Sequence, residues 1–463
     1  MHKKQQLLPN CIASHFLVEY NFREQSLVYI FMAQKKNALL RLFPAFEVRN
    51  YQYYFVGQLI SQIGTWLQIV AQGWLVLTLT KSPLLIGVVA ASGTLPSLLF
   101  SLFGGVIVDR FNKKYLIVIT QVGSMVLAFI LGLLVLTNTI TVWQIIVLSF
   151  LLGTVNAIDM PARQAFVSEM VEADKVPSAI ALNASIYNAA RVVGPSIAGL
   201  LIALVGVSGA FLLNAFSYIA AIIVQFLIVP LVLKHNVKHA HPLQAIKDGV
   251  TYTWSHPVVR SLIVLTAIVS IFGWSYTTIM PLIAKDIFHQ EAAGLGYLFA
   301  ASGLGALCAT FIVSAYGQKI RSSIFINGGL VLFSLAMIGF SFTDNMWAAY
   351  ITLFISGFGL LSTFSVINAR IQHLVEAQFR GRVLSIYLLM FVGLFPVGNF
   401  EIGYVSEHVG PLMAIRIGAF VVLIAAIIGY LLRGKIVESH KEYLTKIELD
   451  NATMEVAGDS RKN

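Results

Sequence analysis

This chain of 463 residues has few charged side chains: Asp, Glu, Lys and Arg make up 11% of it, whereas 57% is hydrophobic. Soluble domains average about 25% charged residues, so the composition argues against a soluble multidomain enzyme and against a disordered protein. Long apolar runs take the place of the missing charges, and a helix needs about 20 mostly apolar residues to cross a bilayer. The composition therefore indicates a membrane protein with many spanning helices.

Residues that carry out chemistry are also scarce. The only cysteines, Cys11 and Cys308, lie far apart in the sequence, which excludes a disulfide framework and a cysteine zinc site. The chain has no Gly-x-x-x-x-Gly-Lys-Ser/Thr loop for nucleotide phosphates. No constellation of His, Cys and carboxylates lies within the apolar runs, and we interpret His235, His239 and His241 as part of a solvated linker. We expect no enzyme activity, no cofactor, no metal and no nucleic-acid partner.

The apolar runs fall into two groups of six. They lie at about 53–79, 84–107, 115–137, 142–160, 178–205 and 208–233, and at about 259–284, 294–316, 322–341, 346–367, 383–403 and 410–432. Two groups of equal size are typical of transporters built from internal repeats. We predict an all-α polytopic membrane protein with twelve transmembrane helices in two pseudo-symmetric six-helix bundles.

This layout also predicts the domain boundaries. The bundles are expected at 50–233 and 259–433, with a cytoplasmic linker at 234–258 and a cytoplasmic tail at 434–463. Residues 1–49 would form a cytoplasmic N-terminal leader. The segment that begins at Met32 reads like a natural start, so residues 1–31 are either a spurious extension or a genuine leader.

The basic residues of the loops lie mainly on one side of the predicted membrane. With a cytoplasmic N-terminus, that side holds Arg110, Lys113, Lys114, Arg163, Lys175, Lys234, Lys238, Lys247, Arg260, Lys319, Arg321, Arg370, Arg380 and Arg382. The opposite side holds only Lys81 and Lys285. Cytoplasmic loops carry such an excess of Lys and Arg. We therefore expect both termini on the cytoplasmic side.

Polar side chains mark one face of the first predicted helix. They are Gln58, Ser61, Gln62, Thr65, Gln68 and Gln72. At 100° per residue they share an arc of about 120°. Lipid cannot satisfy amide groups, so this face must meet water or other helices. We predict that it forms a wall of a central substrate cavity; hydrogen bonding between helices is the alternative.

Other helices contribute to the predicted cavity. Its proposed residues are Gln58, Gln62, Thr65, Gln72, Asn183, Tyr187, Arg191, Thr266, Ser270 and Phe391. A charge well inside an apolar run costs roughly 3 kcal/mol or more. Arg191 is therefore expected either to face the cavity or to pair with a structural partner. Asp109 and Asp159 are expected at cytoplasmic helix ends, which leaves no carboxylate at the centre of an apolar run.

The end of the second predicted helix carries a recognisable loop. Its sequence is Gly105-Val-Ile-Val-Asp109-Arg110-Phe-Asn112-Lys113-Lys114. It resembles the signature Gly-x-x-x-Asp-Arg-x-Gly-Arg-Lys/Arg of the major facilitator superfamily. Asn112 replaces the loop glycine, and Asn tolerates a left-handed backbone. The resemblance implies a cytoplasmic gate: Asp109 would help to lock the bundles together, while Arg110, Lys113 and Lys114 would pair with carboxylates or lipid headgroups.

Three further stretches narrow the resemblance. Gly194-Pro195 and Gly199 on the fifth helix resemble the superfamily's antiporter motif, with Ala198 in place of a glycine. The segments that begin at Gln58 and at Asp159 look like the enterobactin-exporter-like and macrolide-efflux-like branch. Ser149 stands where drug antiporters of the superfamily often carry an arginine in the fourth helix. The coupling ion is therefore left open by the sequence.

These observations predict a secondary active transporter of the bacterial inner membrane. The resemblance implies export of a small amphipathic molecule, such as a siderophore or a macrolide, by alternating access and coupled to protons. We expect it to act as a monomer within the lipid bilayer. A lysophospholipid or lipid flippase and a non-transporting membrane sensor are the alternatives.

Overall fold

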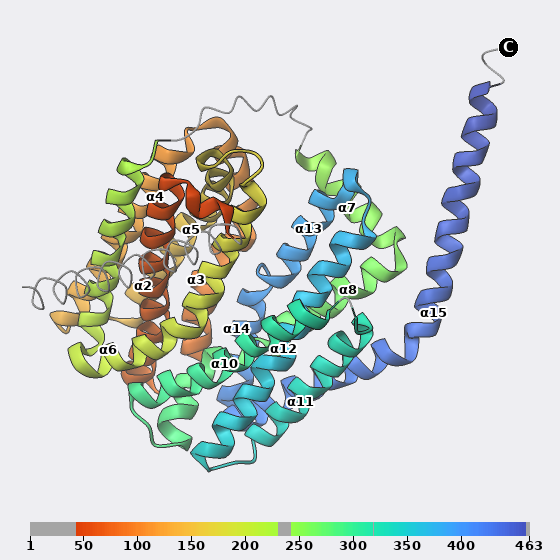
Figure 1. Ribbon diagram of the computed structural model, residues 1–463. Coiled ribbons are helices and arrows are strands. Elements are labelled where there is room, and N and C mark those ends of the chain that lie inside the picture. Colours follow the sequence, from red (N-terminus) through yellow and green to blue (C-terminus); the bar gives the residue numbers. More distant parts are fainter. Residues whose placement is uncertain (1–42, 230–241, 318, 460–463) are drawn as a thin grey trace, which may run out of the picture.

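The computed structural model describes residues 43–229, 242–317 and 319–459, and the regular structure of this part is helical (Figure 1). The elements of the first bundle are η1 (Pro44–Glu47), α2 (Arg49–Thr80), α3 (Pro83–Arg110), α4 (Lys113–Leu136), α5 (Val142–Met170) and α6 (Val176–Leu227). A connecting helix, α7 (Pro242–Ser255), follows. The second bundle contains α8 (Pro257–Ile268), η2 (Val269–Gly273), α9 (Tyr276–Leu282), η3 (Ile283–Ile287), α10 (Ala292–Tyr316), η4 (Ile324–Gly328), α11 (Gly329–Phe340), α12 (Met346–Leu374), α13 (Ala377–Phe391), α14 (Phe395–Val409) and α15 (Pro411–Asp459).

Short capped turns separate the helices. Ser82 accepts a hydrogen bond at the start of α3, directly before Pro83 at the first helical position. Thr141 and Gln144 form a reciprocal capping box at the start of α5. Such side chains satisfy the free N–H groups of a helix start. They explain why the long apolar runs break at these points.

Helix α6 consists of two helices that meet at Gly206, which has φ 73° and ψ 178°. At the start of α2, the Tyr51 hydroxyl donates to the Ala179 carbonyl near the beginning of α6. The neighbouring Asn50 amide donates to the Val229 carbonyl just beyond the end of α6. Both ends of α6 therefore lie beside the start of α2, so the chain reverses direction at Gly206.

The helices match the expected number of membrane crossings. Ten helical segments of the described chain are long and apolar enough to cross a membrane, judged by length and composition. One of them, Val193–Leu227, contains the reversal in α6, and the apolar Ile324–Phe340 is a shorter helical segment. The prediction of twelve helices in two bundles agrees with this arrangement.

The bundles meet at one end of the molecule, which we call the contact end. There α3 lies beside α14, and α6 lies beside α10. Gly87 faces Gly403, and a Cβ on Gly87 would lie 2.9 Å from the Gly403 Cα. Gly199 faces Gly296, and a Cβ on Gly199 would also lie 2.9 Å from the Gly296 Cα. Because only glycine permits so close an approach, these residues bring the backbones of the two bundles into contact.

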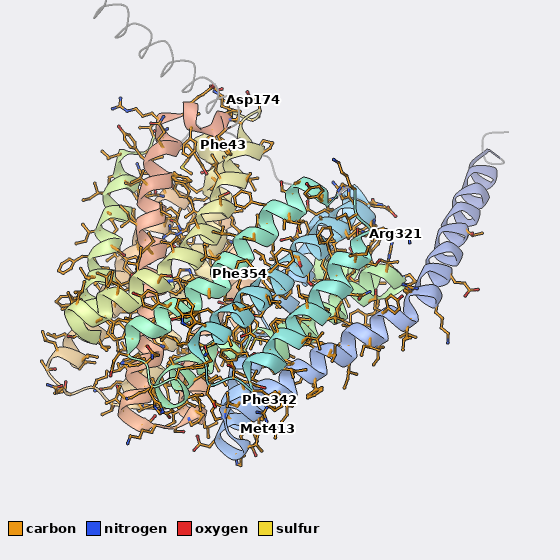
Figure 2. All side chains as sticks on the ribbon, turned by 60° about the horizontal axis from the view of Figure 1, so that its bottom comes forward. Phe43, Asp174, Arg321, Phe342, Phe354 and Met413 are labelled. Carbon is orange, nitrogen blue, oxygen red and sulfur yellow. The ribbon has the colours of Figure 1, made fainter. Side chains whose placement is uncertain are left out.

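The opposite end, which we call the basic end, carries the loops after α3, α5 and α10. In Figure 1 the two bundles diverge toward this end, at the top of the view. In Figure 2, Phe342 and Met413 lie together at the contact end of the second bundle, whereas Arg321 lies toward its basic end and Asp174 at the basic end of the first bundle.

The segments outside the bundles are only partly described. The predicted leader, including residues 1–31, lies outside the described residues up to position 42. The predicted linker contains α7, which begins at Pro242. The predicted tail continues α15 as one helix as far as Asp459. Arg382 on α13 pairs with Asp248 on α7 at 3.0 Å, and this ion pair fixes the connecting helix against the second bundle.

Candidate functional site

A cavity of about 380 Å³ lies between the two bundles. Its walls come from α2, α3, α5 and α6 on one side and from α9, α10, α12 and α14 on the other. Ligand pockets of small molecules typically measure about 300–1,000 Å³. No Asp, Glu, Lys, Arg or His is found among the described residues that line it. The cavity therefore has the size of a small-molecule site.

Helix α2 supplies the amides of the first wall, and neighbouring helices hold them in place. The Gln72 amide donates to the Ser149 hydroxyl at 2.9 Å. The Gln68 oxygen accepts a hydrogen bond of 2.5 Å from the Asn214 amide of α6. Each amide thus retains hydrogen-bonding capacity for a ligand while its position is fixed.

The second wall combines hydroxyl and amide groups. Thr278 donates to the Asn399 oxygen at 2.8 Å, and the Tyr276 hydroxyl lies 3.1 Å from the Ser302 hydroxyl. The Asn399 nitrogen reaches Thr94 of the first bundle at 3.5 Å. Asn399 therefore lines the cavity and also joins the two bundles.

Aromatic rings form one side of this wall. Trp274 and Phe395 line the cavity and stack with ring centroids 6.0 Å apart. Phe391 packs behind both, at 5.8 Å from Trp274 and 5.7 Å from Phe395. Trp274 directly follows the π-helical turn η2, a distortion that is frequent at functional sites. The rings offer a flat apolar surface to a ligand.

The structure distributes the predicted cavity residues over several environments. Thr65 and Gln72 line the cavity. The described lining of the cavity does not include Gln58, Gln62, Asn183, Tyr187, Thr266, Ser270 or Phe391. The Thr266 and Ser270 hydroxyls donate to backbone carbonyls, those of Leu262 and Phe391 respectively. The side chain of Arg191 lies outside the described residues.

The signature loop makes its described contacts within the first bundle. Lys113 pairs with Glu169 at 2.6 Å, and the Lys114 ammonium donates to the Ile228 carbonyl at 2.7 Å. Arg110 is exposed, and the side chains of Gly105 and Asp109 are not described. Asn112 has φ −65°, so its backbone is not left-handed. Its side chain instead caps α4 by accepting a hydrogen bond from the Lys114 amide.

The motif on the fifth helix lies between two partners. Gly194 packs against Trp66 of α2, Pro195 lines the cavity, and Gly199 meets Gly296 of the second bundle. Small residues at these positions let α6 approach both bundles closely. The motif therefore lies where the two bundles are in contact, beside the cavity.

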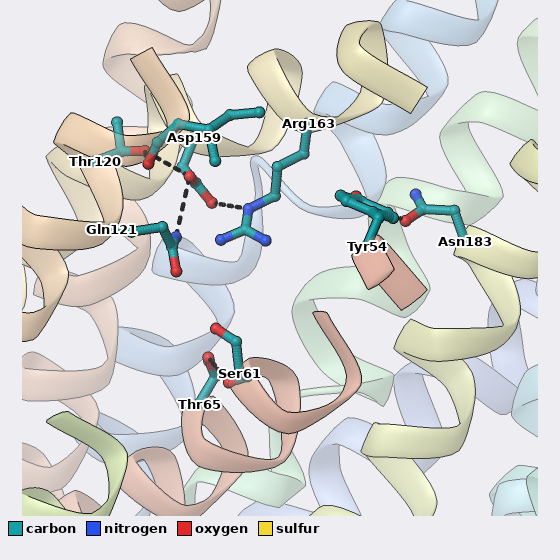
Figure 3. A network of polar contacts seen from close by, with 9 residues as sticks. Tyr54, Ser61, Thr65, Thr120, Gln121, Asp159, Arg163 and Asn183 are labelled. Carbon is teal, nitrogen blue, oxygen red and sulfur yellow. Dashed lines mark hydrogen bonds and ion pairs between the residues drawn. The ribbon is translucent and has the colours of Figure 1, made fainter. Parts of the chain in front are cut away.

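Sequence reasoning missed a buried ion pair inside the first bundle. The expectation that Asp159 marks a helix end, with Arg163 in the following loop, is wrong, because α5 continues to Met170 and both side chains are buried. Arg163 donates to Asp159 at 2.5 Å, and Thr120 and Gln121 of α4 donate to the other carboxylate oxygen at 2.6 and 3.2 Å (Figure 3). The i, i+4 spacing of Asp159 and Arg163 was the available signal in the sequence, because it places both side chains on one face of the helix.

Curated relatives are bacterial transport proteins. The chain is 27% identical to the staphyloferrin A transporter of Staphylococcus aureus, over 78% of this chain and 90% of that protein. It is 24% identical to the multidrug efflux pump Tap of Mycolicibacterium fortuitum, over 76% of this chain and 88% of the pump. It is 18% identical to macrolide efflux protein A of Streptococcus pyogenes, over 77% of this chain and 89% of that protein.

Solved structures support the fold. A bacterial homolog of the human lysosomal transporter Spinster, in an inward-facing conformation, superposes with a TM-score of 0.67. The match covers 86% of this chain and 98% of that chain at 12% identity, so it bears on the fold alone. A family model described as transmembrane secretion effector matches residues 42–460. This chain therefore belongs to the transmembrane secretion effector family of the major facilitator superfamily and is a multi-pass membrane transporter.

Proposed function

We propose that this protein exports a small amphipathic molecule by alternating access, driven by a proton gradient. The observation that carries the proposal is the central cavity, whose walls come from both bundles. A site shared by two bundles changes its accessible side when the bundles rock against each other. The contact end, where glycines join the bundles, would be the gate that opens in the other half of the cycle.

Charge supports an orientation for this cycle. The loops at the basic end hold most of the loop Lys and Arg residues, as cytoplasmic loops do. We therefore place both termini and the signature loop in the cytoplasm, with the protein as a monomer in the bacterial inner membrane. In this orientation the contact end is the outer side, and the conformation described here is the one that receives substrate from the cytoplasm.

The cavity lining favours a particular substrate class. Amides, hydroxyls and the Trp274–Phe395 stack suit a ligand with an apolar or aromatic body and several uncharged polar groups. The drug and macrolide pumps among the relatives and the staphyloferrin A transporter make an antibiotic or a siderophore the natural candidates.

A proton gradient supplies enough energy for such export. One charge that moves down 100 mV releases about 2.3 kcal/mol, which corresponds to roughly fiftyfold accumulation at about 1.4 kcal/mol per decade. The sequence has no phosphate-binding loop for ATP. An ion gradient is therefore the energy source that we propose.

The test is efflux from bacterial cells that lack their own exporters. Cells would be loaded with a panel of macrolides, siderophores and fluorescent dyes, with and without a protonophore. We expect export of some compounds that stops when the gradient collapses, and Phe395→Ala should weaken it. Phe311→Ala, on an exposed side chain of α10, is the control.

Each other outcome would contradict part of the proposal. Export that persists with the protonophore would refute proton coupling. Lipid movement in vesicles without solute export would favour the flippase alternative, and no flux of any kind from an inserted protein would favour a sensor.

A further inference from the structure

A second, small cavity lies inside the first bundle, away from the central one. It has a volume of about 10 Å³ and is lined by residues of α2, α4, α5 and α6, including Tyr54, Gln58, Arg163 and Gln225. A cavity of this size holds about one water molecule. It borders the guanidinium of Arg163, which Figure 3 shows between the Asp159 carboxylate and the Tyr54 ring.

Some amide atoms in and beside this cavity lack a hydrogen bond of good geometry. Gln121 Oε1, Gln225 Nε2 and both amide atoms of Gln58 are buried without a hydrogen bond of good geometry to the described residues. All three side chains are 2% exposed. Buried amides are almost always satisfied, by protein or by ordered water. The cluster is therefore built to hold water between four helices, next to a buried charge pair.

Asp159 is the carboxylate at the centre of this cluster. We propose that Asp159 carries the coupling proton of the transport cycle, with Arg163 as its ion-pair partner and the small cavity beside Arg163 as the route by which the proton arrives. This inference rests on the proposed proton-driven export. The proton adds to the Asp159 carboxylate and gives a neutral carboxylic acid, while Arg163 keeps its charge and loses its ion-pair partner.

The surroundings of Asp159 fit such a change. Thr120 and Gln121 of α4 bind the ionised form. From α2 and α6, the phenols of Tyr54, Tyr187 and Tyr218 lie within electrostatic reach of the pair. Tyr54 itself donates to the Asn183 oxygen of α6 at 3.1 Å. A guanidinium released from Asp159 would thus meet phenol and amide oxygens on two other helices.

Other carboxylates of the described chain fit the role less well. Glu169 and Asp248 form ion pairs near the basic end and are partly exposed. Glu407 is exposed at the contact end and bonds to Ser82. Glu401 on α14 is half-buried and remains the only serious rival among the residues that the structure describes. Asp159 differs from all of them because it combines burial, a cationic partner and adjoining unsatisfied amides.

Helix α2 connects this cluster to the substrate cavity. Gln58 borders the small cavity, whereas Thr65, Gln68 and Gln72 on the same face of the helix line the central one. A rearrangement of Arg163 changes the surroundings of Gln58, and α2 is a rigid element that both sites share. The proton and the substrate would therefore act on one helix without sharing a binding residue.

The experiment uses the purified full-length protein in proteoliposomes, with radiolabelled erythromycin as probe. We expect Asp159→Asn to abolish accumulation driven by a pH gradient while it retains exchange of erythromycin at equilibrium. Infrared difference spectra between high and low pH should show a carboxylic-acid C=O band that Asp159→Asn removes and Asp159→Glu restores. Asp248→Asn, which breaks the partly exposed Arg–Asp pair between the connecting helix and the second bundle, should keep both the band and the accumulation.

A second variant guards against misfolding of Asp159→Asn. Thr120→Val keeps the side-chain volume but removes one hydrogen bond to the Asp159 carboxyl group, so the carboxylic-acid band should change its frequency without disappearing. The inference is overturned if Asp159→Asn still accumulates erythromycin, if the band remains in it, or if Glu401→Gln removes the band instead. Absence of gradient-driven transport in the unaltered protein would refute the proposed function, while the infrared band would still test proton binding at Asp159.

Discussion

The closest approach of the two bundles offers a direct test of the proposed cycle. A Cβ at position 87 would lie 2.9 Å from the Gly403 Cα and nearer still to the Asn399 carbonyl oxygen. Ordinary contacts begin at 3.4 Å and the Asn399 carbonyl oxygen would lie only 2.4 Å from the new Cβ, so Gly87→Ala requires the two backbones to separate by about 1 Å. Overpacking of this kind costs about 1–3 kcal/mol. Because the contact exists only while this end is closed, the cost falls on the closed state.

A cost of this size changes the balance between conformations. About 1–3 kcal/mol shifts a two-state equilibrium by roughly 5- to 150-fold. Spin labels on the exposed Lys81 and Val409 would report the width of the contact end, and labels on Asn112 and Gln378 that of the basic end. We expect Gly87→Ala to lengthen the first distance and to shorten the second, as measured by pulsed electron paramagnetic resonance.

The control is Gly328→Ala, because a Cβ at that position meets nothing within 4 Å. It should leave both distances unchanged. If Gly87→Ala also leaves them unchanged in a folded protein, then the glycine contact does not hold the closed state, and the contact end is not the gate that we propose.

Three further predictions concern single residues. Gly206→Ala places a side chain at φ 73° and ψ 178°, a conformation that costs of order 1–3 kcal/mol outside glycine, and should lower the unfolding temperature in detergent. Glu407 accepts a hydrogen bond of 2.8 Å from the Ser82 hydroxyl at the start of α3. Glu407→Gln removes a negative charge, which stabilises a helix N-terminus by about 0.3–1 kcal/mol. It should lengthen the contact-end distance in a smaller fraction of molecules than Gly87→Ala does. The hydrogen bond to Glu47 raises the pKa of Lys175 above 10.5, so this contact should persist at neutral pH and disappear only as the pH rises past that raised pKa. Limited proteolysis next to η1 should therefore become faster above that pH. In Lys175→Gln it should already be faster at neutral pH.

The bundle architecture was predictable because its signals are local. Apolar runs of sufficient length, interrupted by capping residues such as Ser82 and Thr141, define helices whatever the tertiary contacts are. The reversal inside α6 was also visible as a break between two runs, since glycine supplies the backbone conformation that Gly206 adopts.

The buried ion pair was not predictable in the same way. Pro161 suggests the end of a helix, yet α5 passes through it, because a membrane bundle tolerates a proline where neighbouring groups satisfy the freed carbonyl. The depth of Asp159 depends on that continuation. Similarly, the position of Thr266 on a polar helix face predicts a cavity residue, but its hydroxyl donates a hydrogen bond to a carbonyl of its own helix. The sequence pattern does not distinguish these two arrangements.

The separation of charge from the central cavity has a mechanistic consequence. A buried ion pair is costly and is strongly destabilised when one partner is removed, so its presence inside the first bundle requires an explanation beyond packing. A charge placed in the cavity would bind ionic compounds and would have to be desolvated with every substrate. In the cycle that we propose, a proton that acts on Asp159 instead changes the packing around α2 without binding in the cavity. Such coupling would make no demand on the structure of the substrate, so that one protein could export chemically different molecules.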